Sequence, residues 1–528
     1  MPSSRDVANA TILACCATLI AACAAPSTAP THGGDHVGAG RTVEVPALWA
    51  ARTGESGIER ARVTVGTVGE PGFGIDLADA EAEGAGPQWT AASASAAAVA
   101  TIWSGVDPSI VDIRYEVTGP IDGPSAGGIL TVGTLAGIRG EALDPKVTMT
   151  GTIAPDGAIG PVGGVSAKLR AAADAGFTTV LVPAGNLASA PGLVAEGTAL
   201  GLTVTPIRTL LDAYRGFTGV ALADASCDVT VDPAVVSAAT TATLGAPPAT
   251  AASLGERAKA VSAGARLLID QATAEIAAGV DGLARDQLAA LPALLAPVMR
   301  ADMLARAVST WAEKHPTDAA GAKTAEAMVA FADATVSTFP VSLAAWRALP
   351  PDVPIDPQLA QRRGQAYAVL LQTAATSTLG YLDAVLSLHK NKDAAPQTAI
   401  LADLSLIARD EAAVSASSGL ADTVLETAWA LAAWTAEQQV YDVVALRMGA
   451  SDAELGTRTA SDLVHASACR VLADGLNPSW PVWSTKAAVD LASAAPADVA
   501  QEYWLAATAT ASEAQLALAM QTVQPSTK

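Results

Sequence analysis

The hydrophobic pattern of this chain changes abruptly across a proline- and threonine-rich passage at residues 228–254. Before that passage, runs that alternate apolar and polar residues are mixed with runs at helical spacing. Beyond it, apolar residues recur at helical spacing with almost no strand pattern. A length of 528 residues also exceeds the usual size of one domain. We therefore predict an α+β domain at 41–219, a linker at 220–254 and an all-α, alanine-rich domain at 255–528.

The α+β region contains strand and helix patterns in alternation. Its helix at 87–103 begins with proline, and its helix at 164–176 ends with Gly176, both common helix boundaries. A third helix is expected at 125–138. The expected strands lie at 42–50, 60–69, 111–117, 146–153 and 178–183.

The first 23 residues have the pattern of an export signal. A weakly basic start precedes the apolar stretch TILACCATLIAA, which is too short to span a bilayer. Ile20-Ala21-Ala22-Cys23 is similar to a bacterial lipobox, so we expect Cys23 to carry lipid and 24–40 to be a flexible tether. An ordinary secretory signal with an incidental cysteine is the alternative. In both cases the protein is exported, and with lipid it is anchored to the outer face of the cell membrane or in the envelope.

The charge and the residue types exclude several classes of function. The net charge of −21 repels nucleic acid, so no nucleic-acid partner is expected. The five histidines are scattered and no CxxC or HExxH occurs, so no metal site is expected. Only Cys227 and Cys469 follow Cys23, and they either form a disulfide or stay separate and buried. No later segment is a convincing transmembrane helix.

The segment DGPSAG, residues 122–127, contains a candidate nucleophile, Ser125. Its letters match G-x-S-x-G, the nucleophile turn of α/β hydrolases. That turn needs a histidine base later in the chain, and none occurs between residues 37 and 314. Lys168 lies 43 residues after Ser125 on an expected helix, and a buried neutral lysine can act as a base. From spacing alone, a solvated Lys168 and a helix-capping Ser125 remain the alternative.

DGPSAG and the later run VTMTGTIAPDGAIGPVGGVSAKLRAAADAGFTTVLVP together resemble the proteolytic domain of Lon proteases, peptidase family S16. The resemblance implies a Lon-type α+β domain at 41–219 with Ser125 as nucleophile and Lys168 as base. It implies that Asp122 and Thr150 shape the site, with Thr150 placed to hydrogen-bond Lys168. The helix start offers the backbone N–H groups of Gly123, Ser125 and Ala126 as oxyanion donors.

Two features depart from the Lon pattern. Thr152 stands where the family usually has glutamate, which removes an acidic group near the site. The Walker A pattern G-x-x-x-x-G-K-[ST] of the Lon ATPase module does not occur, since the chain has no Gly-Lys dipeptide. ATP is therefore not expected as a partner, and no cofactor is expected. Lon domains commonly form rings, so an oligomer is possible.

The function expected from these observations is an exported, ATP-independent serine endopeptidase with a Ser-Lys dyad. A peptidase without an unfoldase cuts unfolded or loosely folded polypeptides, which the helical domain would select or present. The alternative is a catalytically silent Lon-fold lipoprotein that acts as a binding or scaffold protein through its helical domain.

Overall fold

The computed structural model describes residues 40–447, with gaps at 52, 68–73, 155–156, 223–249, 280–281, 284, 348–356, 390–399, 401, 405 and 408–419. Cys23, Cys227 and Cys469 lie outside the described residues, as do the expected signal peptide and tether. The expected fold class is confirmed, because a mixed α and β region is followed by a helical one. Among the helices of the described part, none is both long and apolar enough to span a membrane.

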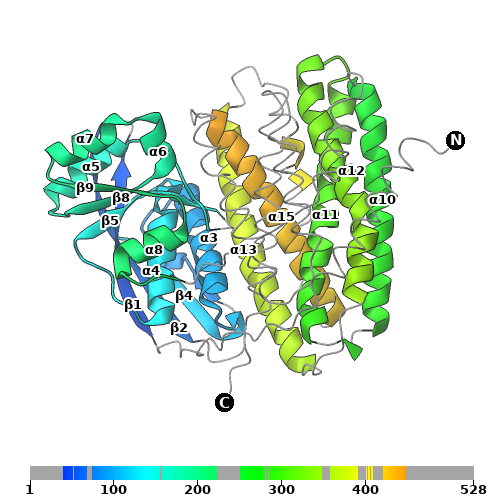
Figure 1. The fold of residues 1–528 in the computed structure, drawn as a ribbon, viewed down its shortest axis with the longest axis horizontal. Helices are drawn as coiled ribbons and strands as arrows, with labels where there is room; N and C mark the ends of the chain where they lie inside the picture. Colours follow the sequence, from blue (N-terminus) through cyan, green and yellow to red (C-terminus); the bar gives the residue numbers. More distant parts are fainter. Residues whose placement is uncertain are drawn as a thin grey trace.

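A seven-stranded sheet forms the centre of the first region, with strand order β3-β4-β2-β1-β5-β8-β9 (Figure 1). β1 pairs antiparallel with β2 and β2 with β4, whereas β1, β5, β8 and β9 run parallel. The carboxyl ends of these parallel strands meet at one edge, where polar residues of a site can gather. The strands are β1 Arg41–Ala50, β2 Ser56–Thr67, β3 Gly74–Asp76, β4 Val111–Glu116, β5 Val147–Met149, β8 Thr179–Pro183 and β9 Thr203–Ile207.

Helices cover both faces of the sheet. On one face, α4 packs against β1 and β2, and the missing side chain of Gly137 leaves room for Val65. On the other face, α5 and α7 form a separate apolar core with Leu48, Val180 and Val182. The helices of this region are α2 Ala78–Ala82, α3 Pro87–Ser104, α4 Gly127–Arg139, α5 Val165–Asp174, α6 Ala184–Ser189, α7 Gly192–Ala199 and α8 Leu210–Thr218.

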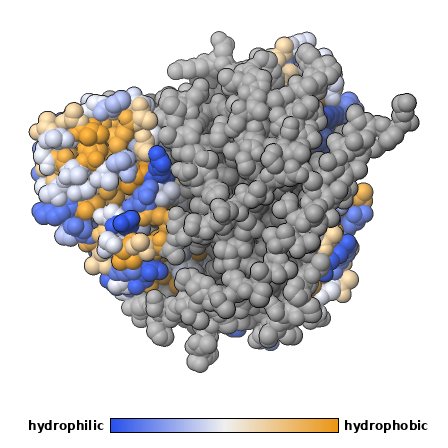
Figure 2. Space-filling view, viewed as in Figure 1, coloured by the Kyte–Doolittle hydropathy of each residue, from blue (hydrophilic) through white to orange (hydrophobic). Residues whose placement is uncertain are grey.

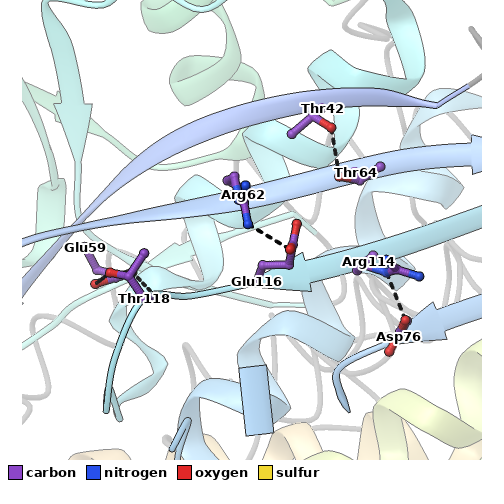
Figure 3. Close-up of polar contacts among 8 residues, drawn as sticks. All are labelled: Thr42, Glu59, Arg62, Thr64, Asp76, Arg114, Glu116 and Thr118. Atoms are coloured by element: carbon purple, nitrogen blue, oxygen red, sulfur yellow. Dashed lines mark hydrogen bonds and ion pairs between the residues drawn. The ribbon is translucent and has the colours of Figure 1, made fainter. Parts of the chain in front are cut away.

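The part of the sheet that α5 and α7 leave uncovered carries polar side chains. Figure 3 shows the ion pair of Arg62 with Glu116, at 2.8 Å, and that of Arg114 with Asp76, at 2.9 Å. Alternating apolar residues of the same strands face α3 and α4, such as Val63 in β2. Exposed pairs of this kind contribute at most about 1 kcal/mol each, so they keep this face soluble more than they stabilise it.

Apolar side chains also reach the surface at α7. Val194 in α7 is 42% exposed and Leu200, which follows it, is 36% exposed. Figure 2 shows the orange apolar colour over this helix. Exposed apolar residues are common on the surfaces of folded domains, so these two do not by themselves indicate a partner.

The helical region begins at Ala251, four residues before the boundary expected at 255, and Ala251 and Leu254 are both buried. Helix α11 packs against α10, α12 and α15, and α13 packs against α15. Helix α13 also lies along α3 of the first region (Figure 1). The helices are α10 Ala251–Gly279, α11 Arg285–Lys314, α12 Ala319–Arg347, α13 Pro357–His389 and α15 Leu420–Arg447.

Two of the expected elements are divided or shortened at the candidate site. The strand expected at 146–153 is divided into β5 and β6 (Thr152–Ile153), because the chain turns at Gly151 and pairs with β7 (Ile159–Gly160) instead. The helix expected from Ser125 starts at Gly127, after a 3₁₀ turn η2 (Pro124–Ala126). The turn places Ser125 outside the regular helix, in a half-buried position.

Candidate active site

The Ser125 turn is held by the residues before it. Gly123 has a φ of 118°, which favours glycine, and Pro124 then starts the 3₁₀ turn. Asp122 Oδ1 accepts hydrogen bonds from the backbone N–H groups of Gln88 at 2.9 Å and Trp89 at 3.2 Å. These N–H groups belong to the first turn of α3, where helices lack internal acceptors. Asp122 thus fixes the Ser125 turn to the start of α3.

The segment after β5 holds Ser125 from the other side. The Gly151 N–H donates to the Ser125 carbonyl oxygen at 3.0 Å, and Thr150 Oγ1 donates to the same oxygen at 3.4 Å. The Gly128 N–H, in the first turn of α4, donates to the Gly151 carbonyl at 2.9 Å. The reciprocal bonds fix the backbone of Ser125 relative to Thr150.

Lys168 reaches the same place from α5. Gly164, with a φ of 69°, begins this helix close to β1, since a Cβ on it would lie 2.8 Å from Ala50 Cβ. Lys168 is only 3% exposed, and its Nζ donates to Thr150 Oγ1 at 3.0 Å, the contact expected for Thr150. Burial lowers the pKa of Lys168 to about 8, because an apolar setting disfavours the ammonium form.

Thr150 therefore connects the two candidate catalytic residues. Its hydroxyl accepts from Lys168 Nζ and donates to the backbone of Ser125. Within the described residues, no hydrogen bond joins Lys168 Nζ to the Ser125 hydroxyl, and no carboxylate pairs with Lys168. Hydrogen bonds between catalytic groups often shorten only when substrate is present. The arrangement supplies a lysine that can become neutral near physiological pH and a serine on a fixed turn, linked to each other through Thr150.

The three expected oxyanion donors are not equivalent. The Gly123 N–H donates to Asp122 Oδ1 at 2.8 Å, so this group is already engaged. The N–H groups of Ser125 and Ala126, in the 3₁₀ turn before α4, remain the candidates. The described residues contain no cluster of three or more histidine, cysteine, aspartate or glutamate side chains suited to a metal ion.

Two glycines of the site were missed by sequence reasoning. Gly86 leaves space for the Asp122 side chain, and Gly151 leaves space for Ile159. A glycine between two short strand patterns, as at Gly151, is a usable signal of a sharp change of direction. Gly86 carried no such signal, since its contact comes from a residue 36 positions later.

Replacing Gly151 by alanine is expected to destabilise the domain by about 1–3 kcal/mol, because the new Cβ would overlap Ile159 and the backbone has a φ of 155°. Thermal or urea unfolding measures the change. Gly163→Ala is the matched control, since a Cβ there meets no atom within 4 Å and should change stability by less than about 0.5 kcal/mol. Equal stability of the two variants would contradict this description of the turn.

Comparison with known proteins connects this geometry to one family. Residues 111–210 match the model described as the Lon protease (S16) C-terminal proteolytic domain. Lon protease 2 of Bacillus subtilis is 41% identical over 81 residues, which cover 15% of this chain and 15% of that relative. The Lon proteases of Clostridium beijerinckii and Frankia alni are 39% identical over 106 residues and 41% identical over 96 residues.

These similarities are local. The two matches cover 20% and 18% of this chain, and 13% and 11% of the respective relatives, so this chain spans a small part of each relative's length. Ser125, Thr150 and Lys168 all lie inside the matched segment, whereas β1, β2, β3 and α3 precede it. Residues 111–210 are therefore similar to the Lon protease (S16) C-terminal proteolytic domain, and this chain joins that segment to a helical region.

Proposed function

We propose that the protein is a serine endopeptidase in which Ser125 is the nucleophile and Lys168 the general base. One observation carries the proposal: a buried lysine, with its pKa lowered to about 8, is hydrogen-bonded to the threonine that also holds the serine backbone. A lysine kept for solubility would lie at the surface, whereas Lys168 is 3% exposed. Burial without a carboxylate partner favours the neutral amine that a base must have.

The proposed reaction follows from these groups. Neutral Lys168 takes the hydroxyl proton as Ser125 Oγ attacks a peptide carbonyl, and the N–H groups of Ser125 and Ala126 stabilise the oxyanion. The Lys168 ammonium then gives its proton to the leaving amine, which leaves an acyl-enzyme. Water, deprotonated by Lys168, hydrolyses the ester and restores Ser125. Thr150 holds the Lys168 amine in place through the hydrogen bond at 3.0 Å.

The substrate class is proposed from what the sequence contains. The 528 residues hold no Walker A pattern, so we propose cleavage without ATP, restricted to polypeptides that are unfolded or loosely folded. We further propose export with a lipid anchor at Cys23, supported by the apolar stretch and the Ile20–Cys23 pattern. Mass analysis of the mature N-terminus tests this part separately.

The direct test is proteolysis of an unfolded protein by the full chain. Wild type should cleave a reduced, unfolded substrate with or without ATP and leave the same substrate intact when it is folded. Ser125→Ala should lose cleavage and keep its thermal unfolding temperature, because Ser125 is half-buried in a turn held by backbone contacts. Inactive wild-type protein against varied unfolded substrates would instead support a silent scaffold. Cleavage by the Ser125→Ala variant would contradict the proposed roles of Ser125 and Lys168.

The pH dependence of kcat/KM should report the protonation of Lys168. Its pKa of about 8 lies below the ordinary value of 10.5, so the fraction of neutral amine rises as pH increases through 8. We expect kcat/KM to rise roughly tenfold per pH unit below about pH 7 and to level off above about pH 9. Measurement from pH 6 to 10 in constant ionic strength gives the profile. A midpoint near pH 6.5 would indicate a histidine base and contradict the proposed role of Lys168.

A further inference from the structure

Helix α3 connects the proteolytic site to the helical region because it is buried on every side. All residues from Ala91 to Ile102 are buried, and most are alanine, serine or valine. A helix buried on every side needs neighbours on every side. The sheet and α4 cover one part of its surface, and α13 covers another (Figure 1). Small side chains allow these helices to approach closely.

Both ends of α3 contact the segments that hold Ser125. At its start, the N–H groups of Gln88 and Trp89 bind the Asp122 carboxylate, three residues before Ser125. At its end, Trp103 lies against Gly157, where a Cβ would be 3.0 Å from the indole Cζ2. Gly157 belongs to the turn between β6 and β7, the hairpin that begins directly after Gly151. The position of α3 therefore affects the site from two directions.

A buried ion pair fixes α13 to the segment that directly follows α3, where Asp107 caps the 3₁₀ turn Pro108–Ile110. Arg363 Nε of α13 lies 3.1 Å from Asp107 Oδ2, and the two side chains are only 9% and 4% exposed. The other carboxylate oxygen, Asp107 Oδ1, accepts from the Ser109 N–H at 2.9 Å and from its hydroxyl at 2.7 Å. Apolar contacts between two alanine-rich helices define register weakly. A buried pair that cannot be broken without a penalty of several kcal/mol defines it strongly.

We infer that Arg363 is a positioning residue for the Ser125–Lys168 site, acting through Asp107 and α3. The inference rests on the proposed function. In this arrangement the helical region holds α3 in the register that places the Ser125 turn and the β6–β7 hairpin. A misplacement of about 1 Å between reacting groups costs on the order of 100-fold in rate. The expected effect of losing Arg363 is therefore on kcat, because its ion pair is with Asp107 and acts on the site only through α3.

The test compares full-chain variants by two measurements. Arg363→Met should lower kcat on an unfolded protein by about 10- to 100-fold with KM within about twofold of wild type. Hydrogen exchange of the amides at 121–127 and 150–160 should become faster in the same variant. Arg363→Lys keeps the charge and should recover part of both properties. The double variant Arg363→Met/Asp107→Asn removes the unpaired buried charge, so it should regain stability and still show the low kcat.

Asp302→Asn is the matched control. Asp302 is fully buried and pairs with Arg266 at 2.9 Å and Arg306 at 3.1 Å inside the helical region, away from α3. It should lower stability and leave kcat and the site's exchange unchanged. Wild-type kcat and exchange in Arg363→Met would overturn the inference, as would a change in KM alone. If wild-type protein cleaves nothing, the proposed function fails, and the exchange data still decide whether Arg363 positions the turn.

Discussion

Lys168→Met is expected to abolish cleavage while making the protein more stable at pH 7. Methionine fills a similar apolar volume but supplies no base, so the rate should fall by about 10³-fold or more. The lysine is 3% exposed and burial lowers its pKa from 10.5 to about 8, so its ammonium form is less stable in the folded protein than in the unfolded chain. Replacing the Lys168 ammonium by methionine removes the free-energy cost of burying this charge.

The sign and size of the stability change follow from proton linkage. Below about pH 8 the lysine is protonated in both states, and the folded protein bears a cost of about 3 kcal/mol. Loss of the hydrogen bond to Thr150 offsets about 1 kcal/mol, which leaves a gain of about 2 kcal/mol for Lys168→Met. Between about pH 8 and 10.5 wild type loses its proton in the folded state alone, so its stability rises with pH and the difference shrinks.

Denaturant unfolding at pH 7 and pH 10, with activity assays on the same samples, measures both effects. Lys146→Met is the control, because Lys146 is exposed and lies in the same domain. Lys146→Met should retain activity, and its stability relative to wild type should not change between pH 7 and pH 10. A Lys168→Met protein that is less stable than wild type at pH 7 would mean that the lysine is better solvated than its position indicates. Retained cleavage would remove Lys168 from the mechanism.

Ser125 and Lys168 could be chosen as candidates from the sequence because each lies in a local pattern. DGPSAG and the glycine pair before the helix of Lys168 both depend on backbone conformations that few residues other than glycine adopt. The role of Asp122 as a cap of α3 was not predictable, since its partners lie 33 and 34 residues earlier. The division of the strand at 146–153 also depends on tertiary context. Gly151 turns there because Ser125 supplies an acceptor for its N–H.

The junction between the two regions was the least predictable part of the fold. A proline-rich linker at 220–254 predicts two independent domains, because such passages usually separate units that have their own cores. The structure instead places residues of both regions in one continuous apolar core. The sequence of α3 did contain a signal, because its alanine and serine residues give the helix no charged face. A helix of this kind in an α+β domain is expected to be covered on its outer side, but the sequence does not say which segment covers it.

Deleting residues 250–528 is therefore expected to unfold the α+β region. A folded fragment with an altered range of substrates is not expected. An 18-residue helix is about 27 Å long, and a face about 10 Å wide would expose about 270 Å² of α3. At about 25 cal/mol per Å² this costs about 7 kcal/mol, which is comparable to the whole stability of a typical domain. We expect residues 40–249 alone to be insoluble or to unfold without a cooperative transition.

The matched control keeps both regions and cuts the polypeptide chain between them. A cleavage sequence for a specific protease, inserted between residues 222 and 250, should yield two fragments that remain associated, melt together and cleave substrate like the uncut protein. Separating them in denaturant should abolish activity, and remixing should restore it. A soluble, cooperatively folded fragment of residues 40–249 would show that α13 is dispensable for the fold. If that fragment also cleaved a narrower set of substrates, the helical region would select substrates instead of completing the core.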